Sequence, residues 1–498
     1  MKVFDTIIIG SGLGGLVTAA ILAKEGQRVL VLEKGKKTGG FLHTFKREQS
    51  VFNTGMNYIG SLEENGLLFQ YFNYLGIMSE LNIQPLDRDG FEEISFEGDA
   101  NKYYYSQGKD EFANRLIQDF PQEAQAINNY TNKLWDITEK FPLLYLQNYD
   151  QIVKGQDYMN GGAWDFINKV TSNPKLKQVL AATNSLYAGV QDKTPLYVHA
   201  LVNRQFIESA WRFVNGSQQL ADALAQKITQ NGGEILNRSQ VVKIATDSVD
   251  QTWVETSSGE RFFGKTIVSN IHPATTLKML DDQRIKHVYR KRITELPNTA
   301  SFFNIYIVFK PNQFKYINKN IYHFTNDHIW LPYTKKDQWP SYFMFYTGCS
   351  KKNQIWADNA ALMTYMDYEE VAKWKGSIKG MRGDEYESFK QQKAEILLAQ
   401  LEKRFPGIKK SIQSYYTATP LTYEHYNAAP QGSAYGIEKD HNNPYKSIIL
   451  PKTKIPNLYF TGQNLNMHGA LGVTIGAVLT SGEILGLNYL IDKIRSSL

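Results

Sequence analysis

The sequence predicts an α/β fold, in which a domain on a parallel sheet is joined to an α+β domain with a mixed or antiparallel sheet and a helical cap. Three observations predict it. Residues 4–40 alternate strand, glycine turn, helix and strand, residues 457–476 form a second strand–glycine turn–helix junction, and a mostly helical stretch lies between them. A chain of 498 residues exceeds what one core needs, so two or three domains are expected.

The first segment has the features of a Rossmann-type dinucleotide-binding unit. A strand at 6–9 enters the turn Gly10-Ser11-Gly12-Leu13-Gly14-Gly15, an apolar helix follows at 16–23, and a strand at 28–32 ends on Glu33. The first glycine permits the tight turn, Gly12 admits a pyrophosphate, Gly15 lets the helix pack on the strand, and the helix N-terminus offers N–H groups to phosphate. Glu33 stands where a carboxylate binds an adenosine ribose, which disfavours NADP and leaves NAD and FAD open.

The middle of the chain alternates in character. Residues 41–60 read as short extended pieces around a turn at 53–55, residues 61–79 as a helix, residues 91–106 as strands and residues 110–200 as mostly helical. We expect the strongly apolar piece at 134–146 to be a buried cap helix; a helix lying in a bilayer interface is the alternative.

Strand and helix signals return from residue 205. They predict a helix to Gln230, a strand with Ile235, a strand at 241–244, a hairpin 253–255/261–263 and a strand at 266–268. Long strands follow at 300–350 and a polar helix at 384–404. These changes divide the chain into a first domain of residues 1–80, 205–285 and 425–498, and a second domain of residues 81–204 and 286–424.

The C-terminal junction predicts a second anion site. A strand at 457–463 runs into a glycine turn, and Gly469 to Gly476 opens a helix of small residues. In a flavoprotein such a helix N-terminus would stabilise negative charge on the pyrimidine end of the reduced flavin.

Composition excludes several classes of function. The net charge of +6 is spread along the chain, which does not indicate nucleic acid but slightly favours an anionic membrane surface. The lone Cys349 excludes an internal disulfide framework and a cysteine-rich metal site, and no metal is expected. No secretory signal or membrane span is recognised, so a cytoplasmic protein, with peripheral membrane contact as a further option, is expected. The aromatic content of 13% suits an apolar cavity or aromatic cores.

Several passages together resemble one flavoprotein family. The pair Gly39-Gly40 is similar to the extended FAD motif of flavoprotein oxidoreductases. With GSGLGG, FLHTF, FNTGMNYIG, ATPLTYEHYNAAPQGSAYG and NLYFTGQNLNMHGALGVTIGA, the chain resembles the phytoene desaturase and carotenoid isomerase superfamily, and most of all its retinol saturase branch. The resemblance implies a discontinuous FAD-binding domain and non-covalent FAD.

The resemblance also implies the cofactor contacts. The adenine is expected beside Val241 or Val242, and the rest of the ADP half beside Gly10, Ser11, Gly12, Leu13, Gly14, Gly15, Glu33, Lys34, Gly40 and Leu42. The reactive edge of the flavin is expected beside Thr54, Gly55 and Met56. Its ribityl chain and pyrimidine are expected beside Gly462, Gln463, Gly472, Val473 and Thr474.

Three positions depart from the family pattern. Many relatives have Arg where Phe41 stands, an acid where Gln463 stands, and the retinol saturases have His where Asn57 stands. Asn57 remains a candidate catalytic residue beside the flavin, but a proton-transfer role of the His in relatives cannot be assigned to it. Candidate proton donors are His468 and Tyr58.

The sequence thus predicts an FAD-dependent oxidoreductase acting on C=C or C–C bonds of a long isoprenoid or polyene lipid, with Tyr435 and His425 on the substrate side. The alternatives are a redox-neutral carotenoid cis-trans isomerase, a flavin amine oxidase and a non-enzymatic flavin-binding carrier. No second dinucleotide motif for a nicotinamide is found, so an external electron donor or acceptor is expected. The oligomeric state is not predicted.

Overall fold

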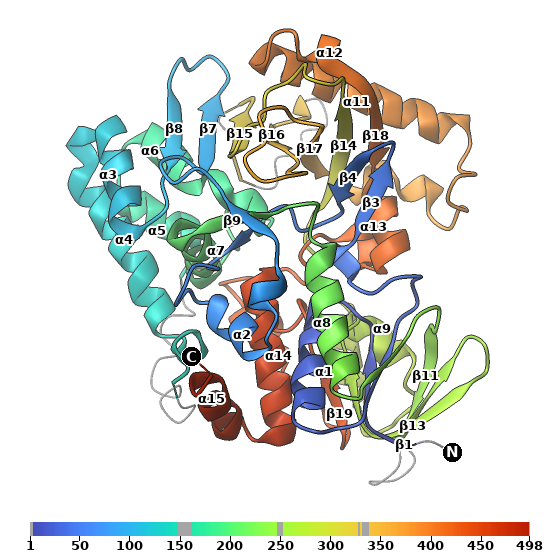
Figure 1. The fold of residues 1–498 in the computed structure, drawn as a ribbon. Coiled ribbons are helices and arrows are strands. Elements are labelled where there is room, and N and C mark those ends of the chain that lie inside the picture. The colour runs from blue at the N-terminus through green and yellow to red at the C-terminus, as the bar shows by residue number, and fades with distance from the viewer. Residues whose placement is uncertain (1–2, 148–160, 247–251, 327–328, 331–337, 498) are drawn as a thin grey trace.

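The computed structural model describes residues 3–147, 161–246, 252–326, 329–330 and 338–497. Two seven-stranded sheets organise these residues. Figure 1 shows the second sheet with α11 (Asp384–Arg404) at the top, and the helices α1 (Leu13–Lys24), α8 (Gln218–Gln230) and α14 (Gly469–Leu485) below it.

The first sheet is a mostly parallel sheet with the order β10-β2-β1-β13-β12-β11, and β19 pairs with the C-terminal half of β13. The pairs from β10 to β13 and the pair with β19 are parallel, whereas β12 and β11 pair antiparallel. The strands are β1 (Val3–Ile9), β2 (Val29–Leu32), β10 (Glu234–Leu236), β11 (Val241–Ala245), β12 (Thr252–Thr256), β13 (Arg261–Ser269) and β19 (Leu458–Phe460).

Helix α1 lies between α8 and α14, so the two ends of the chain pack against each other. All of α1 from Leu13 to Ala23 is buried, as expected for a helix with neighbours on several sides. Close to these helices and the first sheet lie α2 (Phe69–Tyr74), α9 (Pro273–Lys278), α10 (His287–Thr294) and α15 (Leu487–Arg495).

The second sheet has the order β18-β14-β17-β16-β15-β7-β8 and is antiparallel except for the parallel pair β15–β7. Its strands are β7 (Glu92–Phe96), β8 (Lys102–Tyr105), β14 (Ser301–Phe309), β15 (Asn320–Phe324), β16 (Tyr342–Thr347), β17 (Asn359–Met366) and β18 (Ile412–Ala418). Helix α12 (Ile408–Ser411) precedes β18.

The two faces of β14 serve different purposes. Phe303, Ile305 and Ile307 join a core cluster that includes Leu397 of α11, whereas Phe302 and Tyr306 belong to the large cluster on the other face. Successive side chains of a strand point to opposite faces, so both faces of this sheet are covered.

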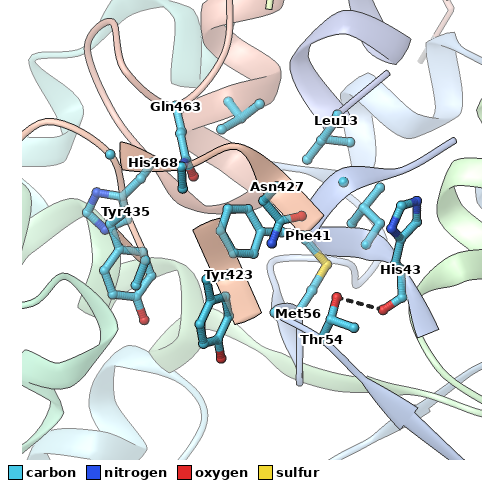
Figure 2. A pocket seen from close by; sticks show the side chains of 18 of the residues that line it. Leu13, Phe41, His43, Thr54, Met56, Tyr423, Asn427, Tyr435, Gln463 and His468 are labelled. Carbon is cyan, nitrogen blue, oxygen red and sulfur yellow. Dashed lines mark hydrogen bonds between the residues drawn. The ribbon is translucent and has the colours of Figure 1, made fainter. Parts of the chain in front are cut away.

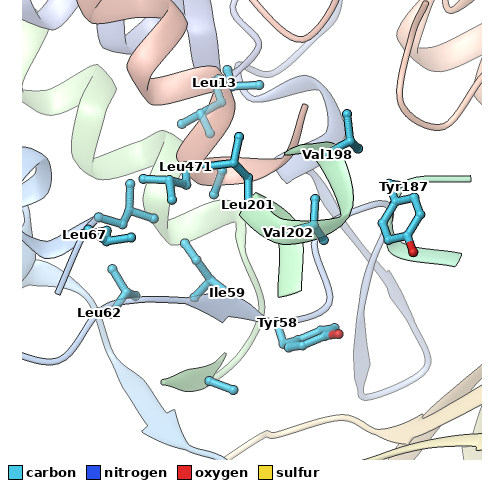
Figure 3. Packing of buried hydrophobic residues seen from close by; sticks show 14 of the residues in the cluster. Leu13, Tyr58, Ile59, Leu62, Leu67, Tyr187, Val198, Leu201, Val202 and Leu471 are labelled. Carbon is cyan, nitrogen blue, oxygen red and sulfur yellow. The ribbon is translucent and has the colours of Figure 1, made fainter. Parts of the chain in front are cut away.

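A helical layer packs beside the second sheet and, through α7, against α14. It contains α3 (Lys109–Asp119), α4 (Ala124–Glu139), α5 (Ala163–Val170), α6 (Pro174–Ala181) and α7 (Leu196–Glu208). Figure 3 shows α7 contributing Val198, Leu201 and Val202 to a core that also holds Leu471 of α14. Smaller elements are the hairpin β3 (Thr44–Arg47)–β4 (Ser50–Asn53), the sheet of β5 (Ile59–Gly60), β9 (Ala210–Phe213) and β6 (Ile83–Pro85), and α13 (Pro420–Asn427).

Most of the element predictions are confirmed, with four corrections. Helix α1 begins at Leu13, inside the glycine motif; the predicted helix at 61–79 shortens to α2; and the two strands predicted at 261–263 and 266–268 are one strand, β13. The apolar piece at 134–146 is not one helix, because α4 ends at Glu139 and a short 3-10 helix covers Pro142–Tyr145, but Leu134, Ile137 and Leu143 are buried, as the cap interpretation requires. The domain boundaries remain a prediction. Helix α10, which falls on the far side of one boundary, packs through Ile293 with the core of the first sheet.

The packing of α1 against β1 depends on Gly15. A Cβ added there would lie 2.2 Å from the carbonyl oxygen of Gly10, and backbone cannot give way as a flexible side chain can. Gly15→Ala therefore lowers the free energy of unfolding by about 1–3 kcal/mol, measured as a lower Tm. The matched control is Gly476→Ala in α14, where an added Cβ meets no atom within 4 Å, and which should leave Tm unchanged or raise it. Equal effects of the two variants would contradict this packing.

Candidate active site

One cavity of about 440 Å³ joins the strand ends of the first sheet to one face of the second sheet. At one end it is lined by residues that follow β1, β2, β13 and β19, such as Gly12, Glu33 and Asn270. At the other end it is lined by side chains of β14, β16 and β17. Ligands of open α/β sheets bind outside the carboxyl ends of the strands, so the first end is the expected dinucleotide site.

Asn270 holds the two glycine turns together. Its Nδ2 donates to the carbonyl oxygen of Gly10 at 3.3 Å. A Cβ added to Gly14 would lie 2.7 Å from its Oδ1, and one added to Gly462 would lie 2.5 Å from the same atom. Glycine is therefore required at both turns, and Asn270 fills the space that the missing side chains leave.

Glu33 is held at the end of β2. Its Oε2 accepts from the backbone N–H and the hydroxyl of Ser11 at 3.0 and 2.6 Å, and its Oε1 accepts from the N–H of Gly35 at 2.6 Å. A carboxylate has lone pairs left for further donors. Lys34 and Val241 also line the cavity, whereas Val242 is 42% exposed and does not. Of the two valines considered for adenine, only Val241 faces this site.

Most of the other residues proposed for the dinucleotide lie on the cavity wall. The lining residues are Gly10, Ser11, Gly12, Leu13, Gly14, Gly40, Leu42, Thr54, Gly55, Met56, Gln463 and Val473. Four of the proposed residues stand behind the wall: Gly15, Gly462, Gly472 and Thr474. The three glycines are close-packing positions, since an added Cβ would lie within 2.5 Å of Gly10, Asn270 or Met467. Figure 2 shows Leu13, Gln463 and His468 on one side of the cavity, with Phe41 and Met56 beside its centre.

The second end of the cavity is aromatic. Even-numbered residues of β14 and β16 point into it, and Tyr423 and Tyr435 complete the wall; Tyr426, the third tyrosine of 420–436 that lines the cavity, is 49% exposed at its rim. The aromatic side chains of this end are Phe302, Tyr306, Tyr342, Tyr346, Tyr423 and Tyr435. Of the described residues that line the whole cavity, Glu33 alone carries a carboxylate, and it lies at the other end.

Asn57 is fixed by two side chains of the second sheet. Its Oδ1 accepts from the hydroxyl of Tyr346 at 2.6 Å, and its Nδ2 faces the sulfur of Met363 at 3.4 Å. The guanidinium of Arg212 lies 5.4 Å from the centre of the Tyr346 ring. Asn57 thus lies on the cavity wall in a fixed orientation.

His468 and Tyr435 lie together at the N-terminus of α14. Their ring centres are 4.6 Å apart, and Nε2 of His468 lies 3.2 Å from the carbonyl oxygen of Leu186. Burial lowers the pKa of His468 to about 4, so this imidazole is neutral near pH 7. His425 is elsewhere: its ring packs on Tyr426 outside the cavity wall, and its carbonyl oxygen accepts from Lys34.

Tyr58 connects the cavity wall to a buried acid. Its hydroxyl donates to Oε1 of Glu92 at 2.7 Å and lies 3.1 Å from the hydroxyl of Tyr322. Glu92 is fully buried, and this burial raises its pKa to about 8. Glu92 and Asn270 are not among the site residues predicted from the sequence. The sequence does contain one sign of a buried acid at this place. Glu92 and Glu93 are neighbours in the apolar strand 91–96, and one of two neighbouring strand residues must face the core.

Comparison with known proteins identifies the class. The chain belongs to the flavin-containing amine oxidoreductase family, which it matches over residues 13–482. It is 28% identical to the all-trans-retinol 13,14-reductase of Rattus norvegicus, with 98% of this chain and 86% of that protein aligned. It is 24% identical to a prolycopene isomerase of an Oncidium hybrid cultivar, over 97% of this chain and 84% of that protein. A solved oxidoreductase from Methanosarcina mazei shares the fold, with a TM-score of 0.63, 15% identity and coverage of 95% and 98%.

The protein is therefore an FAD-dependent oxidoreductase, and its cavity fits that cofactor. The N-termini of both α1 and α14 open on the cavity, and neither has a side-chain cap among the described residues. Free N–H groups at two helix ends suit the pyrophosphate and the electron-rich pyrimidine. The buried wall atoms that have no hydrogen-bond partner in the described structure include Oγ of Ser433 and Oδ1 of Asn464, as expected where a polar ligand completes the site.

The pKa of Glu92 makes stability depend on pH. The unfolded carboxyl ionises near pH 4.5 and the folded one near pH 8, so between these values the unfolded state releases a proton that the folded state keeps. The native state therefore loses stability as pH rises through this window, by an amount on the order of a few kcal/mol. Glu92→Gln keeps the acceptor for Tyr58 but does not titrate, so its Tm should exceed that of the wild type by more at pH 8 than at pH 5. The same difference at both pH values would show that Glu92 is ionised in the folded protein.

Proposed function

We propose that this chain reduces a carbon–carbon double bond of a long apolar isoprenoid or polyene lipid, held in the aromatic end of the cavity. The observation that carries the proposal is the wall of Tyr and Phe side chains without a carboxylate among its described residues. A protonated amine would lose its hydration there with no anion to replace it, whereas a flat polyene loses nothing by leaving water. The similarity to a protein named for 13,14-reduction of all-trans-retinol supports the same class of substrate.

In this proposal the glycine turns, Glu33, Lys34 and Val241 hold the ADP half of a non-covalent FAD, and Thr54, Gly55, Met56 and Asn57 lie near its reactive edge. The N-terminus of α14, with Gln463 and Val473, takes the pyrimidine. When bound, FAD supplies a two-electron carrier that exchanges hydride with carbon. An external electron partner is required.

The chain itself must supply a proton for the second carbon. A neutral His468 whose Nε2–H is directed at Leu186 has no second proton to give. Tyr58 has a hydroxyl proton and stands on the cavity wall, so we assign proton transfer to Tyr58 rather than His468. Tyr435 and the other aromatic residues position the polyene and exclude water.

Anaerobic reoxidation tests the proposal. The purified protein is reduced photochemically, and all-trans-retinol, a carotene, a polyunsaturated fatty acid or an amine is added while the flavin absorbance is followed. We expect a polyene to restore the oxidised flavin band, with one double bond reduced per flavin. Free reduced FAD with the same polyene is the control, and acid precipitation should release the flavin into the supernatant.

Other outcomes assign the alternatives. Changed double-bond geometry without net reoxidation would favour the isomerase reading, which the prolycopene isomerase relative supports. Rapid reduction of the oxidised protein by an amine would favour an amine oxidase and contradict the proposal.

The rim of the cavity suits contact with a lipid surface. Tyr426 lines the cavity and is 49% exposed, and Nζ of Lys379 lies 4.2 Å from the centre of its ring. Ile378 and Met381, on either side of this lysine, are 69% and 76% exposed. Exposed apolar side chains among cations favour an anionic bilayer. Within the described residues, no helix is both long and apolar enough to cross a membrane.

We therefore expect the double variant Ile378→Asp/Met381→Asp to bind vesicles containing phosphatidylserine at least about tenfold more weakly than the wild type, since each change removes apolar contact and adds repulsion. Co-sedimentation measures it. Ile355→Asp, which alters a side chain that is 71% exposed at another place, is the matched control. Equal binding by all three proteins would contradict contact at this rim.

A further inference from the structure

The carboxyl group of Glu92 lies behind the cavity wall at hydrogen-bond distance from a wall residue. Glu92 on β7 has no exposed surface, and its Oε1 lies 2.7 Å from the hydroxyl oxygen of Tyr58. The Tyr58 ring lines the cavity and packs on Phe206, with ring centres 4.4 Å apart. Figure 3 shows Tyr58 beside Val202 of α7, with its hydroxyl directed away from the aliphatic core around Leu62 and Leu67.

Four titratable or charged groups face Glu92. Tyr58 comes from the segment before β5, Tyr322 from β15, Tyr105 from β8 and Arg212 from β9. The Arg212 guanidinium donates to other oxygens, through Nη2 to Oδ1 of Asn320 at 2.6 Å and through Nη1 to the carbonyl oxygen of Thr347 at 2.8 Å, and its Nε has no hydrogen-bond partner in the described structure.

Burial favours the protonated form of this carboxyl. Desolvation outweighs the Tyr58 hydrogen bond, the nearby Asn320 side chain and the attraction of Arg212, and it raises the pKa of Glu92 to about 8. Its second oxygen, Oε2, has no hydrogen-bond partner in the part of the chain that the structure describes. A purely structural carboxyl in a core would be expected to satisfy both oxygens, because an unpaired buried oxygen costs free energy.

We propose that Glu92 is the proton reservoir of the reduction and acts through Tyr58, which is the group that touches the substrate. This inference rests on the proposed function. The 2.7 Å separation between the two oxygens allows a protonated Glu92 to donate to Tyr58 as well as an ionised one to accept from it.

The step balances without a further reactant. The bound cofactor, when reduced, would supply hydride for one C–H bond, and the electron pair of the double bond would take the Tyr58 proton to form the other. The Tyr58 oxygen takes the proton of Glu92 in the same step, so that a carboxylate remains at Glu92 and the tyrosine is restored. Water reprotonates Glu92 before the next turnover.

Single-turnover reoxidation of the reduced holoenzyme by all-trans-retinol tests the relay over pH 6–10. For the wild type we expect the rate to fall as pH rises above about 8, because the carboxyl is then ionised. Glu92→Gln should lower the rate at pH 7 about 100-fold or more, and its remaining rate should not change near pH 8. Tyr58→Phe should lower the rate to a similar extent, and the double variant should be no slower than either, because the two residues act as a unit.

The matched control is Glu93→Gln. Glu93 is the next residue of the same strand, but it faces the other way and pairs with Arg404. Its variant should keep the wild-type rate and pH profile. Infrared difference spectra give a readout independent of activity: the wild type should show the carbonyl band of a protonated carboxyl that disappears near pH 8 and is absent from Glu92→Gln.

The outcomes separate two failures. If retinol and the other polyenes of the panel do not reoxidise the wild type, the proposed function fails, and this inference with it. If the wild type is reoxidised but Glu92→Gln keeps its rate and pH profile, or if the carbonyl band does not depend on Glu92, the relay is contradicted and the proposed function stands.

Discussion

The close approach of two glycine turns around Asn270 is the constraint on which the rest of the structure depends. Gly14 belongs to the first turn and Gly462 to the last, and added Cβ atoms at both would overlap the same Asn270 oxygen. The contact brings α1 beside α14, so two helix N-termini open on one cavity. Two turns that are 448 positions apart in the sequence thereby lie beside a single cavity. Any side chain at these turns would push the second helix end away from the first.

The two faces of the second sheet have different surroundings, because alternate side chains of each strand point to opposite faces. Odd residues of β14 pack with α11 in a core of Phe, Ile and Leu, while even residues present aromatic rings to the cavity. The aromatic wall is therefore supported from behind by an ordinary hydrophobic core. Because the wall contributes flat surfaces and few charges, the buried Glu92 behind it, in contact with Tyr58, has a pKa that differs from that of an exposed acid.

The glycine motif, its helix and the acid at Glu33 could be predicted from the sequence, because each depends on local geometry: a tight turn, a missing Cβ or a strand end. The C-terminal junction was predictable for the same reason. Asn270 was not, since its partners lie 260 positions earlier at Gly10 and nearly 200 later at Gly462. Nor could Asn57 be assigned an orientation, because Tyr346, which fixes it, is 289 positions away. For the aromatic wall, the sequence indicated only a high aromatic content. Which aromatic residues line the cavity depends on how β14, β16 and β17 pair, and this pairing cannot be read from the sequence. His425, selected from its passage, packs outside the wall.

The central claim is that FAD and a polyene share one continuous cavity, with the cofactor held between the two glycine turns and the polyene against the tyrosines of the second sheet. A crystal structure of the holoenzyme with an unreactive retinoid analogue tests it most directly. We expect adenosine beside Glu33 and Val241, the flavin ring between Met56 and the N-terminus of α14, and the analogue against Tyr306, Tyr342 and Tyr435. Density for the analogue anywhere else, or a flavin that fills the aromatic end itself, would contradict it.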